Sequence, residues 1–229
     1  IASVILLSRP FGPEISITAI GFGAGAGIAH SIGLMLMWAV LRNEEASRVV
    51  PVAHTFPIFV AILASVFLGE SLGLVTWLGI TITVAGSVLI SARRVPGRRP
   101  FLGRSFLILA LASFAFATSH TMSKQALADL SQWHVFGLFY LCMTIGFLSV
   151  GLRPSFLREV STIVRRPSST VWFVIHQSIG ALALGSQLAA FAAGPVSLAA
   201  TIVATRPFFL FVFAVFTSWV VPRYIHEPL

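Results

Sequence analysis

Seven long apolar segments constrain this chain more than any other feature of its sequence. They cover residues 15–41, 46–68, 72–92, 105–123, 135–152, 170–192 and 196–221. A helix that crosses a bilayer needs roughly 20 apolar residues, and each segment has that length or nearly so. The segments do not alternate apolar and polar residues, as the strands of a membrane barrel do. They therefore predict helices, in which the backbone polar groups are bonded within the segment.

The composition indicates the same class of protein. Hydrophobic residues make up 57% of the chain and charged residues only 10%, whereas soluble domains carry about 25% charged residues. We therefore expect an all-α polytopic membrane protein, placed in the lipid bilayer of a plasma membrane or a bacterial inner membrane. The net charge of +8 does not indicate nucleic acid as a partner, because the arginines lie in short gaps between apolar segments. The single cysteine, Cys142, excludes a disulfide framework and a cysteine metal site; no cofactor and no metal are expected.

Arginine is distributed unequally between the two sides of the predicted membrane. The gaps after the first, third, fifth and seventh segments hold eleven arginines, and Arg48 near the start of the second segment is a twelfth on the same side, whereas the other side holds only Arg9 and Lys124. Cytoplasmic loops are enriched in Lys and Arg, so the arginine-rich gaps are predicted to be cytoplasmic. The longest of these gaps, 153–169, fits either a short amphipathic helix in the headgroup region or a solvated loop.

The second and seventh segments repeat one pattern. Residues 57–70 read PIFVAILASVFLGE and residues 206–219 read RPFFLFVFAVFTSW; a shift of 150 places Pro57 on Pro207 and Thr55 on Thr205. The same shift places the first segment on the sixth. Corresponding segments are five apart, an odd number, so the two copies must cross the membrane in opposite directions. Inverted repeats of this kind are typical of transporters that bind substrate near the bilayer midplane.

The repeat also predicts the domain organisation. Residues 1–95 form an incomplete first repeat, 96–104 a basic linker, and 105–229 an incomplete second repeat. An inverted-repeat helical bundle with ten spans is expected for the intact protein, of which about seven are complete in this chain.

Two prolines and one arginine are the sharpest candidates for a functional site. Pro57 and Pro207 are predicted to break their helices, because each proline deletes a backbone hydrogen bond and frees a carbonyl that needs a new partner. Arg206 is eleventh of the 26 residues of its segment, where a charge costs roughly 2.5–3.5 kcal/mol unless it faces the interior or a wet cavity. Its guanidinium is suited to holding a carboxylate or phosphate of a substrate. The alternatives are a structural pairing with the freed carbonyls or extension toward the membrane surface.

Further substrate-binding candidates are polar residues at membrane depth. They are His54, Thr55, His176, Gln187 and Thr205, of which His176 and Gln187 share a small polar face on the sixth segment. The alternative interpretation is that the histidines form ordinary hydrogen bonds between helices. Because histidine titrates near physiological pH, His54 or His176 is also a hypothetical site of proton coupling.

Two other motifs have structural interpretations. Glu70 or Ser71 lies where it can cap the helix that follows. The run GFGAGAG at 21–27 lies inside an apolar segment without a preceding strand, so it predicts close helix packing rather than a phosphate loop.

The chain also resembles a known family. Residues 44–94 read EEASRVVPVAHTFPIFVAILASVFLGESLGLVTWLGITITVAGSVLISARR, with an Ala/Ser-rich helix, a proline, an apolar run, LGE and a Gly-containing helix. This order is similar to the end of an EamA-type repeat of the drug/metabolite transporter superfamily, and 194–216, GPVSLAATIVATRPFFLFVFAVF, resembles the second copy. The resemblance implies a secondary transporter, not an enzyme, that moves small organic metabolites such as amino acids or related compounds, by alternating access and in the efflux direction. The alternative is a non-transporting polytopic membrane protein, a receptor or scaffold. The sequence leaves open whether the protein forms a homodimer.

Overall fold

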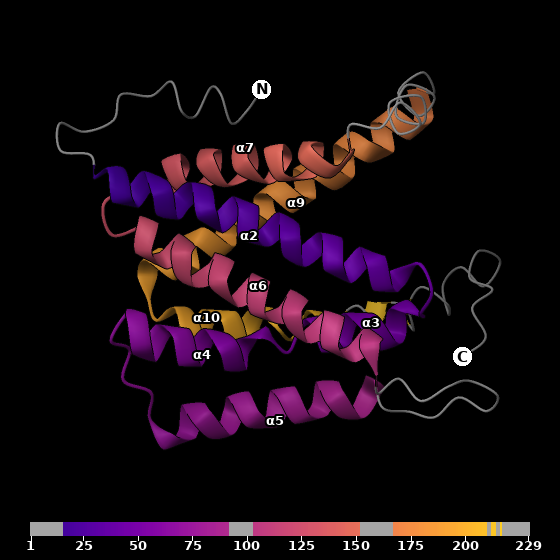
Figure 1. The fold of residues 1–229 in the computed structure, drawn as a ribbon, viewed down its shortest axis with the longest axis horizontal. Coiled ribbons are helices and arrows are strands. Elements are labelled where there is room, and N and C mark those ends of the chain that lie inside the picture. Colours follow the sequence, from indigo (N-terminus) through magenta and orange to yellow (C-terminus); the bar gives the residue numbers. More distant parts are fainter. Residues whose placement is uncertain (1–15, 92–102, 152–166, 210–211, 214–215, 217–229) are drawn as a thin grey trace.

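The described part of the chain is a bundle of α-helices (Figure 1). A computed structural model describes residues 16–91, 103–151 and 167–209, together with residues 212, 213 and 216. Within them, five helical stretches are long and apolar enough to cross a membrane, which confirms the predicted class of polytopic helical protein. In chain order the helices are α2 (Ile17–Leu41), α3 (Ala46–Ala53), α4 (Phe56–Phe67), α5 (Leu74–Ser91), α6 (Arg104–Ala126), α7 (Gln132–Gly151), α9 (Pro167–Ala193) and α10 (Val196–Val203).

Glycine lets α2 pack closely between α6 and α7. A Cβ atom on Gly27 would overlap the carbonyl oxygen of Phe139 and lie 2.9 Å from the backbone nitrogen of Met143. A Cβ on Gly33 would lie 2.7 Å from the ring of Phe116 on α6. These glycines lie in or just after the predicted packing run, and they permit the backbone approach that small residues give in membrane bundles.

The second apolar segment is divided into two helices. α3 ends at Ala53, a turn follows at His54 and Thr55, and α4 begins at Phe56 with Pro57 in its first turn. A proline fits this position because the first turn of a helix needs no backbone N–H donor. The break therefore lies where the sequence predicted that the helix would lose a hydrogen bond.

The seventh segment has the same break at the same register. α10 ends at Val203, a turn follows at Ala204 and Thr205, and helical structure resumes at Arg206 with Pro207 second. Both bounds of α10 equal those of α3 shifted by 150, and the first residue of α9 equals that of α2 shifted by 150. The two copies run antiparallel, because the end of α4 adjoins the beginning of α10.

α6 is the central element of the bundle. It contacts α2 on one side and α3, α4, α9 and α10 on the others, while α5 lies at the edge beyond α4 (Figure 1). α9 is the least buried long helix, and its side chains from Val171 to Gly180 are exposed. The predicted surface segment 153–166, the linker residues 96–102 and the end of the seventh segment lie outside the described residues.

Candidate functional site

The first helix break is stabilised by hydroxyl groups. Pro57 has no N–H to donate to the carbonyl of Ala53, four residues earlier. The hydroxyl of Ser113 on α6 lies 3.0 Å from that carbonyl oxygen and 2.9 Å from that of Val52, and it is buried. Thr55 donates its hydroxyl to Val52 at 2.8 Å and lies 3.2 Å from Ser113. The carbonyl freed at this depth is thus satisfied inside the protein, as an apolar surrounding requires.

The second break has the equivalent threonine bond. Thr205 donates its hydroxyl to the carbonyl of Ile202 at 2.7 Å, and Thr205 and Ile202 are the residues that the shift of 150 places on Thr55 and Val52. Threonine hydroxyls commonly close such turns by bonding to backbone carbonyls. Both predicted threonines therefore stabilise the turns through their hydroxyl groups, and neither lines the cavity described below.

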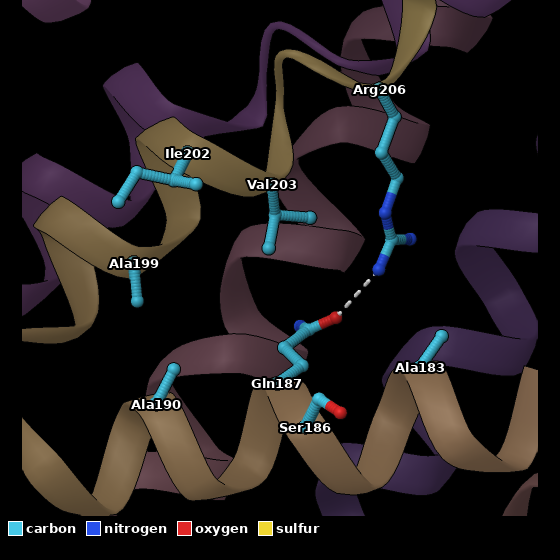
Figure 2. A pocket seen from close by; sticks show the side chains of 8 residues that line it. All are labelled: Ala183, Ser186, Gln187, Ala190, Ala199, Ile202, Val203 and Arg206. Atoms are coloured by element: carbon cyan, nitrogen blue, oxygen red, sulfur yellow. Dashed lines mark hydrogen bonds between the residues drawn. The ribbon is translucent and has the colours of Figure 1, made fainter. Parts of the chain in front are cut away.

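A chain of polar side chains links three helical elements beside the second break. The guanidinium of Arg206 donates to Gln187 Oε1 on α9 at 3.2 Å (Figure 2). The amide nitrogen of Gln187 donates in turn to His120 Nε2 on α6 at 2.9 Å. His120 is therefore the acceptor at Nε2, and its buried Nδ1 has no hydrogen-bond partner among the described residues.

Two more histidines lie around this chain. The ring centroids of His30 on α2 and His120 are 6.5 Å apart, and the Nδ1 atom of His30 is likewise buried without a partner in the described part of the chain. His54, in the first break, bonds through Nδ1 to the carbonyl of Val50 at 2.9 Å. The His54 ring packs on Phe56 with centroids 5.8 Å apart, and Phe56 packs on His120 at 4.9 Å. Through His120 and Gln187, the first break therefore meets the second break at one polar centre.

A cavity of about 250 Å³ lies between α9 and α10 at this centre. Figure 2 shows Arg206 reaching across it toward Gln187, with the apolar side chains of both helices around them. Arg206 is exposed on its cavity side, whereas Gln187 is buried. The lining residues are Ala183, Ser186, Gln187, Ala190, Ala199, Ile202, Val203 and Arg206.

The structure brings together only some of the residues predicted for the site. Arg206 and Gln187 line the cavity, whereas His54 lies in the first break and is not among the lining residues. His176 does not join them: it is exposed, bonds to Gln177 at 3.2 Å, and precedes Gln187 by eleven residues, or roughly 16 Å of helix. His30 and His120 were not among the predicted site residues, because periodicity within one segment does not show which helices meet.

Two charged side chains hold the turn between α9 and α10 at one end of the bundle. The carboxylate of Glu70, just after α4, accepts hydrogen bonds from the backbone of Val196 at 2.7 Å and of Ser197 at 3.3 Å, and from the Ser197 hydroxyl at 2.6 Å. Lys124 of α6 donates to the carbonyls of Phe191 at 2.5 Å and Gly194 at 2.9 Å. A negative charge at the start of a helix and a positive charge at its end both interact favourably with the helix dipole. Glu70 therefore caps α10, not the helix that follows it in sequence.

Comparison with known proteins finds a family match in the first part of the chain. Residues 1–92, which include α2, both halves of the first break and Glu70, match the EamA-like transporter family along that whole stretch. This part of the chain is therefore similar to EamA-like transporters. A stretch of 70 residues is also 34% identical to a protein of Sinorhizobium sp. described as "Uncharacterized transporter in cobO 3'region".

That match covers 31% of this chain and 50% of the Sinorhizobium protein, so the chain spans about half the length of the curated relative it matches. The EamA-like resemblance predicted from residues 44–94 is confirmed. The first helix break thus belongs to the EamA-like part of the chain, and Arg206 lies in the second copy of the pattern, beyond the matched residues.

Proposed function

We propose that the intact protein is a secondary transporter of small organic metabolites, with amino acids and related compounds as first candidates, in the efflux direction. The observation that carries this proposal is the pair of helix breaks at equivalent positions of two antiparallel copies. They meet at a polar centre that contains Arg206, Gln187 and His120. Broken helices at the interface of inverted repeats are the arrangement by which many carriers bind substrate near the midplane.

Alternating access follows from the same arrangement. The turn at each break interrupts the helical hydrogen bonds, so each half-helix can tilt without unwinding a continuous helix. The cavity lies between α9 and α10 of the second copy, and a tilt of α10 relative to α9 would open or close it. The match of residues 1–92 to a transporter family supports this proposal.

Counterflow in liposomes tests transport itself. The full-length protein is reconstituted into liposomes that are loaded with a panel of unlabelled metabolites. Uptake of the same compounds in labelled form is then measured. We expect saturable exchange for at least one compound and none in protein-free liposomes. Failure of the whole panel to exchange, with correctly folded protein in the membrane, would favour a receptor or scaffold.

Proline variants test the role of the breaks. Pro57→Ala restores a backbone donor for Ala53 and allows α3 and α4 to join into one helix, so exchange should slow several-fold. Pro51→Ala is the matched control, because it removes a proline from within α3 and leaves the turn at His54 and Thr55 unchanged. Equal rates in Pro57→Ala and the parent protein would show that the break is a packing feature.

A further inference from the structure

Arg206 has no acidic partner in the described part of the chain. Its one hydrogen bond there goes to the neutral amide of Gln187. The acidic residues described by the structure are Glu44, Glu45, Glu70 and Asp129, and none of them lines the cavity. A guanidinium carries five N–H donors, so most of its donors are available to a bound group.

The depth of Arg206 in the membrane indicates a soluble ligand rather than a lipid headgroup. Arg206 follows Val196, the first residue of α10, by ten residues. This is roughly 15 Å of helix, or half of the hydrocarbon core of about 30 Å. Lipid phosphates lie at the membrane surface, whereas a substrate enters the cavity.

The cavity wall limits the charge of that substrate. Apart from Ser186, Gln187 and Arg206, the lining side chains are apolar. Charge is costly in such surroundings unless it is paired. One guanidinium compensates one negative charge, so a monoanion fits and a dianionic phosphate leaves an excess. The absence of an acidic residue from the described lining leaves an ammonium group without a partner.

From these observations we propose that the cavity selects small monocarboxylates with an apolar chain. The inference rests on the proposed transport function and, among small organic metabolites, favours carboxylates without an ammonium group over the amino acids named above. Arg206 holds the carboxylate with two parallel hydrogen bonds, the geometry that a guanidinium offers. The chain packs on Ala190, Ile202 and Val203. Gln187, oriented by His120, positions the guanidinium through its 3.2 Å hydrogen bond.

Binding of three matched compounds to the purified full-length protein, measured by titration calorimetry, tests the proposal. They are 4-methylpentanoate, its neutral amide, and leucine, which adds an ammonium group to the same skeleton. The acid should bind about tenfold or more tightly than the amide, because a charged hydrogen bond is lost with the charge. It should also bind more tightly than leucine and inorganic phosphate. Equal or tighter binding of the amide, leucine or phosphate overturns the proposal.

Two variants test whether Arg206 causes the preference for the acid over the amide. Arg206→Gln should abolish the preference for the acid over the amide. Gln187→Glu keeps the shape of the side chain but gives Arg206 an internal carboxylate, so it should also weaken binding of the acid. Arg42→Gln, which removes an exposed arginine at the end of α2, is the control and should bind like the parent. A preference that survives Arg206→Gln contradicts the proposal.

The counterflow assay separates this inference from the transport function. If neutral compounds exchange and carboxylates neither bind nor exchange, transport stands and the substrate class is wrong. If no compound exchanges, the transport function itself fails.

Discussion

At the residue scale, the two copies build the same break and place different side chains next to it. Thr55 and Thr205 make equivalent bonds to Val52 and Ile202. One residue further, the first copy has Phe56, whose ring packs on His120 with centroids 4.9 Å apart. The equivalent residue in the second copy is Arg206. The backbone geometry is therefore shared, and an arginine in place of a phenylalanine puts a positive charge beside the second break only.

Ser113 is predicted to be the residue on which the first break depends most for stability. Ser113→Ala removes the donor to the Ala53 carbonyl and leaves it unpaired in the core, which should lower the free energy of unfolding by about 1–3 kcal/mol. Equilibrium unfolding of the full-length protein in mixed detergent measures this loss. Thr118→Ala is the control on the same helix: Thr118 bonds to the carbonyl of Phe114 within α6, and its loss should change stability by less than about 0.5 kcal/mol. Equal effects of the two variants would contradict the role of Ser113.

At the element scale, the helices and the breaks could be predicted, but their partners could not. Apolar runs fixed the positions of α2, α6, α7 and α9 to within a few residues, because spanning length and composition are local properties. Proline predicted the breaks for the same reason, since it acts on its own helix. Ser113 could not be assigned to the break, because it lies 60 residues from Ala53 in the sequence. Contacts of this separation depend on how helices pack.

Two other interpretations show the same limit. Glu70 was expected to cap the helix that follows, yet its partners are 126 and 127 residues away at the start of α10. The helical periodicity of α9 correctly grouped His176 with Gln187 on one side of a helix. It could not show that neighbouring helices reach Gln187 and leave His176 exposed.

The cap on α10 gives a prediction for a whole element. Glu70→Ala removes the acceptor of three hydrogen bonds at the start of α10, and loss of a helix cap costs about 0.5–2 kcal/mol. The thermal midpoint of the purified protein should therefore fall. The matched control is Asp129→Asn, which neutralises an exposed acid just after α6 and should leave the midpoint unchanged. An unchanged midpoint in Glu70→Ala would mean that packing alone holds α10.

At the scale of the whole molecule, the two ends of the bundle differ in their charged residues. Arg42, Arg48 and Arg104 lie at one end, where α2 finishes and α3 and α6 begin. Glu70 and Lys124 lie at the other end and hold the turn between α9 and α10. If arginine marks the cytoplasmic side, the end that these two residues fasten faces outward. Glu70 and Lys124 then hold the turn between α9 and α10 on the outer side of the membrane.

Cysteine labelling of intact cells tests this orientation. In a full-length background with Cys142→Ser, a single cysteine replaces either Asn43 or Asp129, which are both exposed and lie at opposite ends of the bundle. A membrane-impermeant maleimide should label Asp129→Cys from outside, and it should label Asn43→Cys only after the cells are permeabilised. The reverse pattern would place the arginine-rich end outside. Glu70 and Lys124 would then hold the turn between α9 and α10 on the cytoplasmic side.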